Sequence, residues 1–211
     1  KAGTSVRVGG HSSPPYNESN VSLNVGDDPK KVKENRIELL MHLGISTEPI
    51  WLKQEHNKKI LLVDEAPTDI KADGSYTTEK NKVCVVTTAD CVPILFCNDE
   101  GTKVAAIHAG WRGLAAGVIG AAMAELDGRG PFVAAVGPRI CVDCYEVGSE
   151  VIDGIGASVP QNVFRREGPS RAHADLRAAA RWQLEQANQL CAATPGGQWP
   201  TSRSCGMGRR S

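Results

Sequence analysis

The sequence predicts an α/β domain of mixed α+β character. Apolar segments of strand length alternate with longer segments of helical periodicity, and no internal repeat interrupts this order. The 211 residues are enough for one large domain, and a hydrophobic fraction of 41% is enough for a buried core. We therefore expect a single domain over residues 1–190. Residues 191–211 form an atypical C-terminal tail, where Gly, Pro, Ser and Arg replace the apolar pattern.

The N-terminal half is predicted to hold one helix and several short strands. Asp28 and Pro29 are a natural N-cap and first helical residue, and Gly44 is a helix stop, so we expect a helix over residues 29–43. Its apolar face would be formed by Val32, Ile37, Leu39, Leu40 and Leu43. Residues 64–76 are expected to form a loop, and strands are expected over residues 4–10, 50–52, 59–63 and 82–87.

The central part of the chain is predicted to form a β-hairpin followed by a helix. Strands are expected over residues 92–97 and 103–108, closed by a turn at residues 98–101. Pro93 fits best if its strand lies at a sheet edge or is bulged near its start. The later elements are a helix from 109 to about 126, a strand over 132–136, a helix over 146–155 and an Ala-rich helix over 175–190.

Charge and cysteine content exclude several classes of protein. Lys plus Arg and Asp plus Glu both number 24, and this balance lacks the basic footprint of a general nucleic-acid binder. No stretch approaches the roughly 20 apolar residues of a membrane-spanning helix. Seven cysteines, an odd number, do not fit a secreted disulfide framework, so we expect reduced thiols and a cytoplasmic location. The expected partner is a small-molecule substrate, with no obligate protein partner evident.

The predicted hairpin places a cysteine opposite a histidine. If Asn98 pairs with Gly101 across the turn, the register brings Cys91 directly opposite His108. Directly opposed Cβ atoms lie about 4.5–5.5 Å apart, close enough for a thiolate and an imidazole to share one zinc ion. A bulged loop of three residues would shift this pairing by one residue. The alternative, which spacing by itself favours, is that both are ordinary core residues.

A third ligand has to come from the remaining histidines. The chain has five, which are His11, His42, His56, His108 and His173. His42 belongs to a helix end and needs no further role, whereas His56 lies in a loop between two predicted strands, a common place for functional side chains. Two histidines and one cysteine make a three-ligand site with an open position, which is the pattern of catalytic rather than structural zinc.

The segment after His108 supplies a second sign of a functional site. The stretch Gly110-Trp111-Arg112-Gly113 opens a predicted helix, where glycines, an arginine and free backbone N–H groups can bind an anion. A strand-to-helix turn with a salt-bridging arginine explains the same stretch nearly as well.

Cys141 and Cys144 have the C-x-x-C spacing of a redox pair or half a zinc site, but no second such pair exists, and we interpret them as structural or incidental.

Two longer motifs resemble the signatures of a known family. Thr88-Ala89-Asp90-Cys91-Val92-Pro93 and His108-Ala109-Gly110-Trp111-Arg112-Gly113 are closely similar to stretches of the YfiH-like laccase-domain family. Its members are described as polyphenol oxidases (laccases) or as purine nucleoside phosphorylases. Shorter matches, including Gln54-Glu55-His56, keep the same order over about residues 4–190. The resemblance implies an α/β/α sandwich with a mixed sheet, in which His56, Cys91 and His108 bind a catalytic zinc.

The resemblance also implies a reaction on purine nucleosides, namely phosphorolysis of adenosine and inosine together with deamination of adenosine. Basic groups would hold phosphate, and Arg36 and Arg112 are the candidates. A carboxylate would shuttle protons, and Asp73 and Asp90 are the candidates. Asn24 is a further candidate for binding the substrate.

Two alternatives remain open under the same resemblance. Copper-dependent oxidation of phenols is the older family label, and His and Cys ligands suit copper as well as zinc. A four-copper cluster needs many histidines with His-x-His pairs, whereas this chain has five histidines and no such pair. A non-enzymatic, metal-stabilised interaction domain is the second alternative, which a closed four-ligand site would favour. His11 stands where the family usually has Val and is a further candidate ligand, and residues 191–211 lack the usual closing motif of the family.

Overall fold

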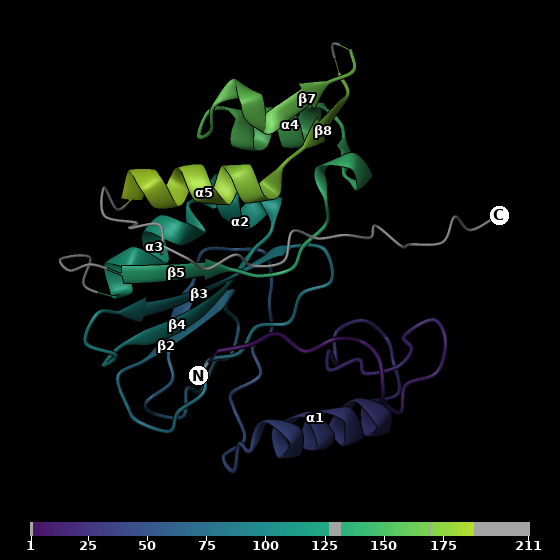
Figure 1. Cartoon of the computed structure of the whole chain (residues 1–211), viewed down its shortest axis with the longest axis vertical. Helices are drawn as coiled ribbons and strands as arrows, with labels where there is room; N and C mark the ends of the chain where they lie inside the picture. The colour runs from purple at the N-terminus through teal and green to yellow at the C-terminus, as the bar shows by residue number, and fades with distance from the viewer. Residues whose placement is uncertain (1, 127–131, 169, 188–211) are drawn as a thin grey trace.

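The computed structural model describes residues 2–126, 132–168 and 170–187, and these residues form three layers. A mixed β-sheet lies in the middle (Figure 1). Helices α2 (Trp111–Ala116), α3 (Val118–Glu125) and α5 (Leu176–Ala187) lie over one face, and α1 (Pro29–Leu43) lies on the other side. The predicted mixed α/β class is therefore confirmed. The tail predicted over residues 191–211 lies outside the described residues.

The central sheet has the strand order β1-β2-β4-β3-β5. β1 and β2 run parallel, and the other neighbours run antiparallel. Its strands are β1 (Ile60–Leu62), β2 (Gly74–Thr77), β3 (Val92–Asn98), β4 (Val104–Ala109) and β5 (Phe132–Val136). A smaller antiparallel sheet lies beside helix α4 (Ser149–Gly156) (Figure 1). In spatial order it consists of β6 (Glu146–Val147), β8 (Ala172–Ala174) and β7 (Phe164–Arg166). Two short 3-10 helices, η1 (Val142–Cys144) and η2 (Gln161–Val163), complete the described elements.

The main core lies between the sheet and helices α2, α3 and α5. Ile94 and Ile107 point into it from adjacent strands, and Leu114, Val118 and Ile119 meet them from the helices, all fully buried. Close packing of such side chains is the largest favourable contribution to folding. This core fixes the β3–β4 hairpin and the start of α2, which are the elements on which the site depends.

Helix α1 begins and ends where the sequence predicts, but its apolar face is not buried as predicted. The Asp28 side chain accepts a hydrogen bond of 2.8 Å from the Lys30 N–H, and Gly44 adopts a left-handed conformation with φ of 63°. Val32 is buried, whereas Ile37 and Leu43 are 59% and 56% exposed. The inward face is instead anchored by the buried side chain of Asn35.

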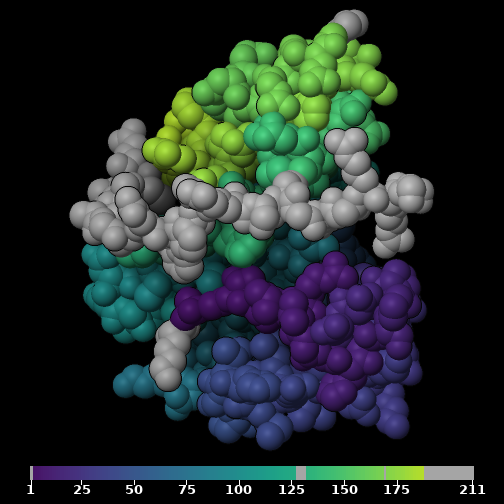
Figure 2. All heavy atoms as spheres, turned by 45° about the vertical axis from the view of Figure 1, so that its right-hand side comes forward, coloured from purple at the N-terminus to yellow at the C-terminus, as the bar shows by residue number. Residues whose placement is uncertain are grey.

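The Asn35 side chain ties α1 to the N-terminal coil. Its Nδ2 group donates to Ser12 Oγ at 2.9 Å and to the Asn20 carbonyl at 2.8 Å, and its Oδ1 accepts from the His11 N–H at 2.7 Å. A buried amide that forms these bonds can replace apolar contacts in holding a helix. Figure 2 shows the N-terminal segment (purple) lying against α1 (blue).

Several of the strand predictions are correct and others are wrong. The strands expected over 59–63, 92–97, 103–108 and 132–136 correspond to β1, β3, β4 and β5. The segments 4–10, 50–52 and 82–87 form no strand, and β2 lies in the segment predicted to be a loop. An apolar run does not by itself provide a neighbouring strand with which to form a ladder, whereas the polar Gly-Ser-Tyr-Thr sequence of β2 pairs with strands on both sides.

The helix predictions for the second half need three corrections. The helix predicted from 109 to 126 is divided at Gly117, whose φ of 82° ends α2 and begins α3. The helix predicted over 146–155 is preceded by β6 and begins only at Ser149. The described part of the last helix is α5, which ends at Ala187, and the predicted residues 188–190 lie outside the described residues.

Of the two arrangements expected for Pro93, the sheet edge is wrong, because β3 pairs with β4 on one side and β5 on the other. Pro93 is the second residue of β3, and its carbonyl accepts a hydrogen bond of 2.9 Å from the Gly137 N–H. Proline is tolerated at such a strand start.

Among the described residues, no helix has both the length and the apolar character needed to cross a membrane.

Candidate metal centre

The structure brings His56, Cys91 and His108 together at one point. Their potential ligand atoms all lie within 4.8 Å of one another. Cys91 Sγ is 3.9 Å from His56 Nε2, and the two imidazole rings have centroids 4.7 Å apart in an edge-to-face arrangement. With bonds of about 2.0–2.3 Å to nitrogen and sulfur, one ion can contact all three groups from this spacing after small side-chain adjustments. The group could therefore hold a metal.

The hairpin register that led to this site is nevertheless wrong by two residues. Pro93, rather than Cys91, lies opposite His108. Asn98 pairs with Lys103 through a hydrogen bond of 3.1 Å, so the turn is longer than predicted. A shift of two residues keeps each side chain on its original face, whereas a shift of one would have reversed it. Cys91 is thus the residue just before β3 and a diagonal neighbour of His108, close enough to share an ion.

The Asn98 side chain explains the longer turn. Its Oδ1 accepts hydrogen bonds of 2.8 Å from the backbone N–H groups of both Thr102 and Lys103. Gly101 supplies the left-handed residue that the turn requires, with φ of 67°. Asparagine commonly caps turns in this way. The prediction of a tight turn over residues 98–101 did not include these two hydrogen bonds.

His56 lies in the loop before β1, and this loop is tied to the segment that precedes Cys91. Gln54 Nε2 donates to the Thr87 carbonyl at 2.8 Å, and the Thr87 N–H donates to Gln54 Oε1 at 2.8 Å. His56 itself adopts a left-handed conformation with φ of 59°, which is uncommon for a residue with a side chain. Sequence reasoning gave Gln54 no role, although it directly precedes Glu55-His56 in the recognised motif.

A fully buried carboxylate, Asp73, lies beneath the two histidines. Asp73 Oδ1 is 2.8 Å from His108 Nδ1, and the carboxylate also accepts hydrogen bonds from three consecutive backbone N–H groups, those of residues 55, 56 and 57. Burial raises the pKa of Asp73, but these hydrogen bonds outweigh burial and leave the pKa below its usual value. The carboxylate is therefore ionised at neutral pH.

The two histidines have opposite pKa shifts. Burial lowers the pKa of His108, but its hydrogen bonds to Asp73 and Cys91 and their negative charges outweigh burial and raise the pKa to about 9. The pKa of His56 is lowered, first by burial and then by the positive charge of His108. The site thus concentrates negative charge around His108, which favours a cation at this position.

Gly110 provides the space in which these groups meet. A Cβ atom placed on Gly110 would lie 2.8 Å from Cys91 Sγ and 2.9 Å from His56 Cδ2, closer than any real contact. The sequence left two interpretations of the Gly110–Gly113 stretch open, an anion-binding site and an ordinary strand-to-helix turn. The structure adds a steric role for Gly110 next to two candidate ligands, because any side chain here would push them apart.

Two of the predicted substrate-binding residues lie close to the candidate ligands. Arg112 is exposed on α2, its guanidinium lies 4.3 Å from the centre of the Trp111 ring, and its charge contributes to the lowered pKa of His56. Asp90 is exposed and immediately precedes Cys91, and its backbone carbonyl accepts a hydrogen bond of 2.9 Å from the Ile140 N–H.

The other predicted substrate-binding residues have different surroundings. Asp73 has no exposed surface and is already bonded on both oxygens, so it lies beneath the site instead of facing a substrate. Arg36 lies on α1, where its guanidinium stacks 3.9 Å above the Trp51 ring and its Nε donates to the Val21 carbonyl at 2.8 Å. Asn24 is exposed in the N-terminal coil.

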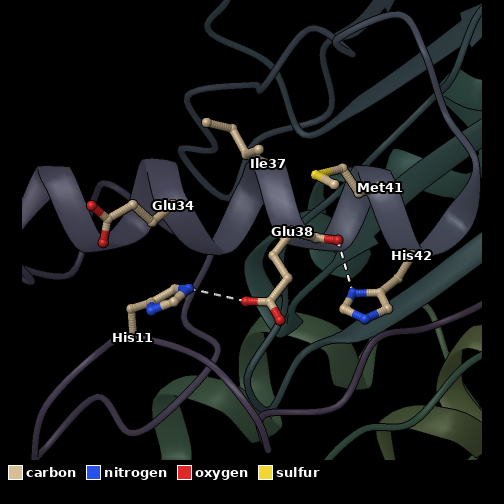
Figure 3. A pocket seen from close by; sticks show the side chains of 6 residues that line it. All are labelled: His11, Glu34, Ile37, Glu38, Met41 and His42. Atoms are coloured by element: carbon tan, nitrogen blue, oxygen red, sulfur yellow. Dashed lines mark hydrogen bonds and ion pairs between the residues drawn. The ribbon is translucent and has the colours of Figure 1, made fainter.

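His11 does not belong to the three-residue group. Its Nε2 lies 3.0 Å from the Glu38 carboxylate on the outer side of α1, in a shallow cavity (Figure 3). His42 borders the same cavity and points its Nδ1 at the Glu38 backbone carbonyl, 2.9 Å away. Within the described residues, the one group of His, Cys and acidic side chains close enough to hold a metal is His56, Cys91 and His108.

Other features near the site were not given a role from sequence. Tyr145 is half-buried, and burial, followed by the negative charge of Cys91, raises the pKa of its hydroxyl. Its place in the Tyr145-Glu146-Val147-Gly148 stretch was the available signal. The sulfur atoms of Cys141 and Cys144 lie 2.9 Å apart at η1. Cys84, which does not belong to the site, is partly buried, and burial raises the pKa of its thiol to about 11.

The fold and the His–Cys–His group together define an α/β domain with a potential metal centre at one end of its sheet. The chain belongs to the family described as multi-copper polyphenol oxidoreductase laccase, whose profile matches residues 1–203. This membership agrees with the family to which the Thr88–Pro93 and His108–Gly113 motifs are similar.

Comparison with known proteins gives more specific similarities. The chain is 45% identical over 150 residues to purine nucleoside phosphorylase YfiH of Escherichia coli, covering 70% of this chain and 62% of that relative. It is 33% identical over 208 residues to adenosine deaminase RL5 from an unknown prokaryotic organism, covering 90% and 78% of the two chains. The crystal structure of Neisseria meningitidis protein NMB0706 superposes with a TM-score of 0.80 at 37% identity, covering 86% of this chain and 76% of that one. The chain thus spans less than two thirds of the length of the Escherichia coli relative.

Proposed function

We propose that this chain is a metal-dependent purine nucleoside phosphorylase that also deaminates adenosine. The observation that carries the proposal is the convergence of His56, Cys91 and His108 within 4.8 Å. Three protein donors leave a coordination position for a reactant, as in catalytic rather than structural zinc sites. The names of the relatives, purine nucleoside phosphorylase and adenosine deaminase, support the choice of substrate.

The residues present suit a zinc ion. One thiolate and two imidazoles are the donor types that zinc prefers, and Gly110 leaves them room to meet. A zinc ion held by His56, Cys91 and His108 supplies a Lewis acid. We propose zinc as the cofactor on these grounds.

The remaining chemistry falls to side chains around the ligands. In phosphorolysis, the bond between the ribose C1′ and the purine nitrogen breaks, a phosphate oxygen bonds to C1′, and the purine takes up a proton. We assign the proton-carrying role to Asp90, because it is exposed beside Cys91, and not to Asp73, which is buried and fully bonded. Of the two phosphate-binding candidates, we favour Arg112, because it lies closer in the chain to the candidate ligands than Arg36 does. Arg36 and Asn24 would contact outer parts of the substrate.

In deamination, water adds to C6 of the purine and ammonia leaves, so no oxidant or phosphate is required. We assign to Asp90, which is exposed beside Cys91, the role of accepting the proton of the attacking water and returning one to the leaving amine. The partners are therefore purine nucleosides and phosphate. Because a ligating thiolate must stay reduced, we also propose a reducing, cytoplasmic environment.

Copper-dependent oxidation of phenols is the second candidate, favoured by the family description and by the same donor set. Oxidation requires a metal that changes valence, which zinc does not. A metal exchange therefore separates the two proposals. Zinc-loaded, copper-free protein should act on adenosine and inosine and leave phenols unchanged.

The test is a paired assay of the zinc-loaded protein and its Cys91→Ala variant. Release of purine with phosphate, and of ammonia from adenosine, should fall at least about 100-fold in Cys91→Ala, because a ligand to the metal is lost. Cys97→Ala, at the far end of β3, is the matched control and should retain activity. If only copper-loaded protein is active, and only on phenols, the nucleoside proposal is wrong and the copper-dependent oxidation of phenols is the correct function.

A further inference from the structure

His56 and His108 come from different elements, yet both are held by the same carboxylate. His56 lies in the loop before β1, His108 lies near the end of β4, and Asp73 directly precedes β2 between them. We propose that Asp73 is a positioning residue that orients both histidines and so sets the affinity of the site for its metal. This inference rests on the proposed use of these histidines as ligands and goes beyond it.

The contact with His108 decides which ring nitrogen faces the site. Both oxygens of Asp73 already accept backbone N–H groups, so Asp73 acts as an acceptor and the proton at its 2.8 Å contact belongs to His108 Nδ1. Nε2 is then the nitrogen that would bind an ion in place of a proton, and the ring cannot rotate without breaking the bond to Asp73. A second bond of 2.7 Å, from the His108 N–H to the Asp73 carbonyl, holds the two backbones in register. Asp73 is fully buried, so bulk water does not compete for these bonds.

The contact with the His56 loop works through the backbone. The N–H groups of Glu55, His56 and Asn57 donate to the carboxylate at 3.1, 2.9 and 2.7 Å. These bonds hold His56 in its left-handed conformation, with φ of 59°, which a residue with a side chain rarely adopts unless its surroundings impose it. The direction of the His56 side chain, and hence the position of Nε2 beside Cys91, follows from this backbone conformation.

The two oxygens of Asp73 divide these contacts in a way that an amide cannot reproduce. Oδ1 accepts from the His56 N–H and from His108, and Oδ2 accepts from the N–H groups of Glu55 and Asn57. In Asp73→Asn, an amide NH2 must replace one oxygen and face donors. In one orientation it opposes the loop N–H groups. In the other it opposes the His56 N–H and donates to His108 Nδ1, which moves the imidazole proton to the nitrogen that should bind the metal.

The test measures zinc affinity by competition with a chromophoric chelator. Asp73→Asn should raise the Kd for zinc about 10- to 100-fold, as for other outer partners of metal-bound histidine. Asp64→Asn is the matched control, because Asp64 also accepts several hydrogen bonds but binds Thr77 and Thr78 at the opposite end of β2. Its Kd should stay within about twofold of that of the unaltered protein. An unchanged Kd in Asp73→Asn overturns the proposal.

A second measurement needs no variant and so remains decisive if Asp73→Asn does not fold. In zinc-loaded protein labelled with 15N-histidine, His108 should carry its proton on Nδ1 and bind through Nε2, and a merely structural role of Asp73 does not require this. The reverse assignment overturns the proposal, as does a failure of the chain to bind zinc. Both readouts concern the metal, so absence of nucleoside turnover with these results intact would contradict the proposed reaction alone.

Discussion

The two ends of the β3–β4 hairpin are stabilised in different ways. At the turn, Asn98 closes the chain with bonds to residues four and five positions further on, Thr102 and Lys103. At the opposite end, Cys91 and His108 meet His56 and Asp73, which come from segments at least 18 residues earlier in the chain. The first end depends on one local side chain, whereas the second depends on side chains from several segments that are distant in the chain. Changes at the turn should therefore affect stability, and changes at the site end should affect metal binding.

Among changes that leave all three candidate ligands in place, the largest effect on metal binding is expected from Gly110→Ala at the site end. The new methyl group would lie 2.8 Å from Cys91 Sγ and 2.9 Å from His56 Cδ2, so both candidate ligands must move. Alanine tolerates the Gly110 backbone, with φ of −74° and ψ of 170°, so the effect is steric. Zinc affinity, measured by chelator competition, should fall about 100-fold.

Gly120→Ala is the matched control for this change. Gly120 lies within α3, and a Cβ atom there meets nothing within 4 Å. Zinc affinity should be unchanged, and the helix should become slightly more stable because alanine has the higher helix propensity. If both variants bind zinc as tightly as the unaltered protein, the ligands are not confined by Gly110.

A smaller and different effect is expected from Asn98→Ala at the turn end. Two backbone N–H groups lose their acceptor, which should reduce the free energy of unfolding by about 1–2 kcal/mol in urea denaturation. The zinc Kd should stay within about twofold, because distant sites behave additively. Glu100→Ala, an exposed change in the same turn, should do neither. A parallel loss of zinc affinity in Asn98→Ala would show that the two ends are coupled.

The smallest effect on stability is expected from His56→Gly. Relief of the left-handed conformation, which costs a residue with a side chain roughly 1–2 kcal/mol, is partly offset by the greater entropy of glycine in the unfolded chain. The metal-free variant should therefore be as stable as the parent or more stable by up to about 1 kcal/mol, a rise in Tm of at most about 4 °C. Zinc binding should be lost at the same time.

Asn57→Gly is the neighbouring control for His56→Gly. The Asn57 side chain accepts a hydrogen bond of 2.7 Å from the Lys59 N–H, so its removal should lower the Tm. A fall in Tm for His56→Gly that equals the fall for Asn57→Gly would mean that the left-handed backbone at His56 stores no strain.

The comparison of the hairpin ends also explains which features could be predicted from sequence. The bounds of α1 follow from Asp28 and Gly44, because caps act within a few residues. The two strands of the hairpin could be predicted because the apolar residues that define each strand lie within that strand. The register was wrong because the Asn98 side chain lengthens the turn. β2 was missed because its sequence has no apolar alternation, and its pairing depends on two other strands.

The three candidate ligands of the site could be predicted from the sequence. The residues that position them and leave them room, Asp73 and Gly110, could not be predicted in these roles. Cys91 and His108 stand out by their place in the hairpin and His56 by its loop, and the family motifs contain all three. Asp73 was a candidate for proton transfer or substrate binding, and its contacts with the His56 loop and His108 could not be predicted, because spacing cannot show that a carboxylate is fully buried. The steric role of Gly110 depends on side chains that approach from other segments, which no local pattern reveals.

We propose that His56, Cys91 and His108 bind one metal ion together. The most direct measurement is anomalous diffraction at the zinc edge from crystals of zinc-loaded protein. We predict a single strong peak among His56 Nε2, Cys91 Sγ and His108 Nε2, at about 2.0–2.3 Å from each atom. A peak bound elsewhere, or one that contacts only two of the three side chains, would contradict the claim.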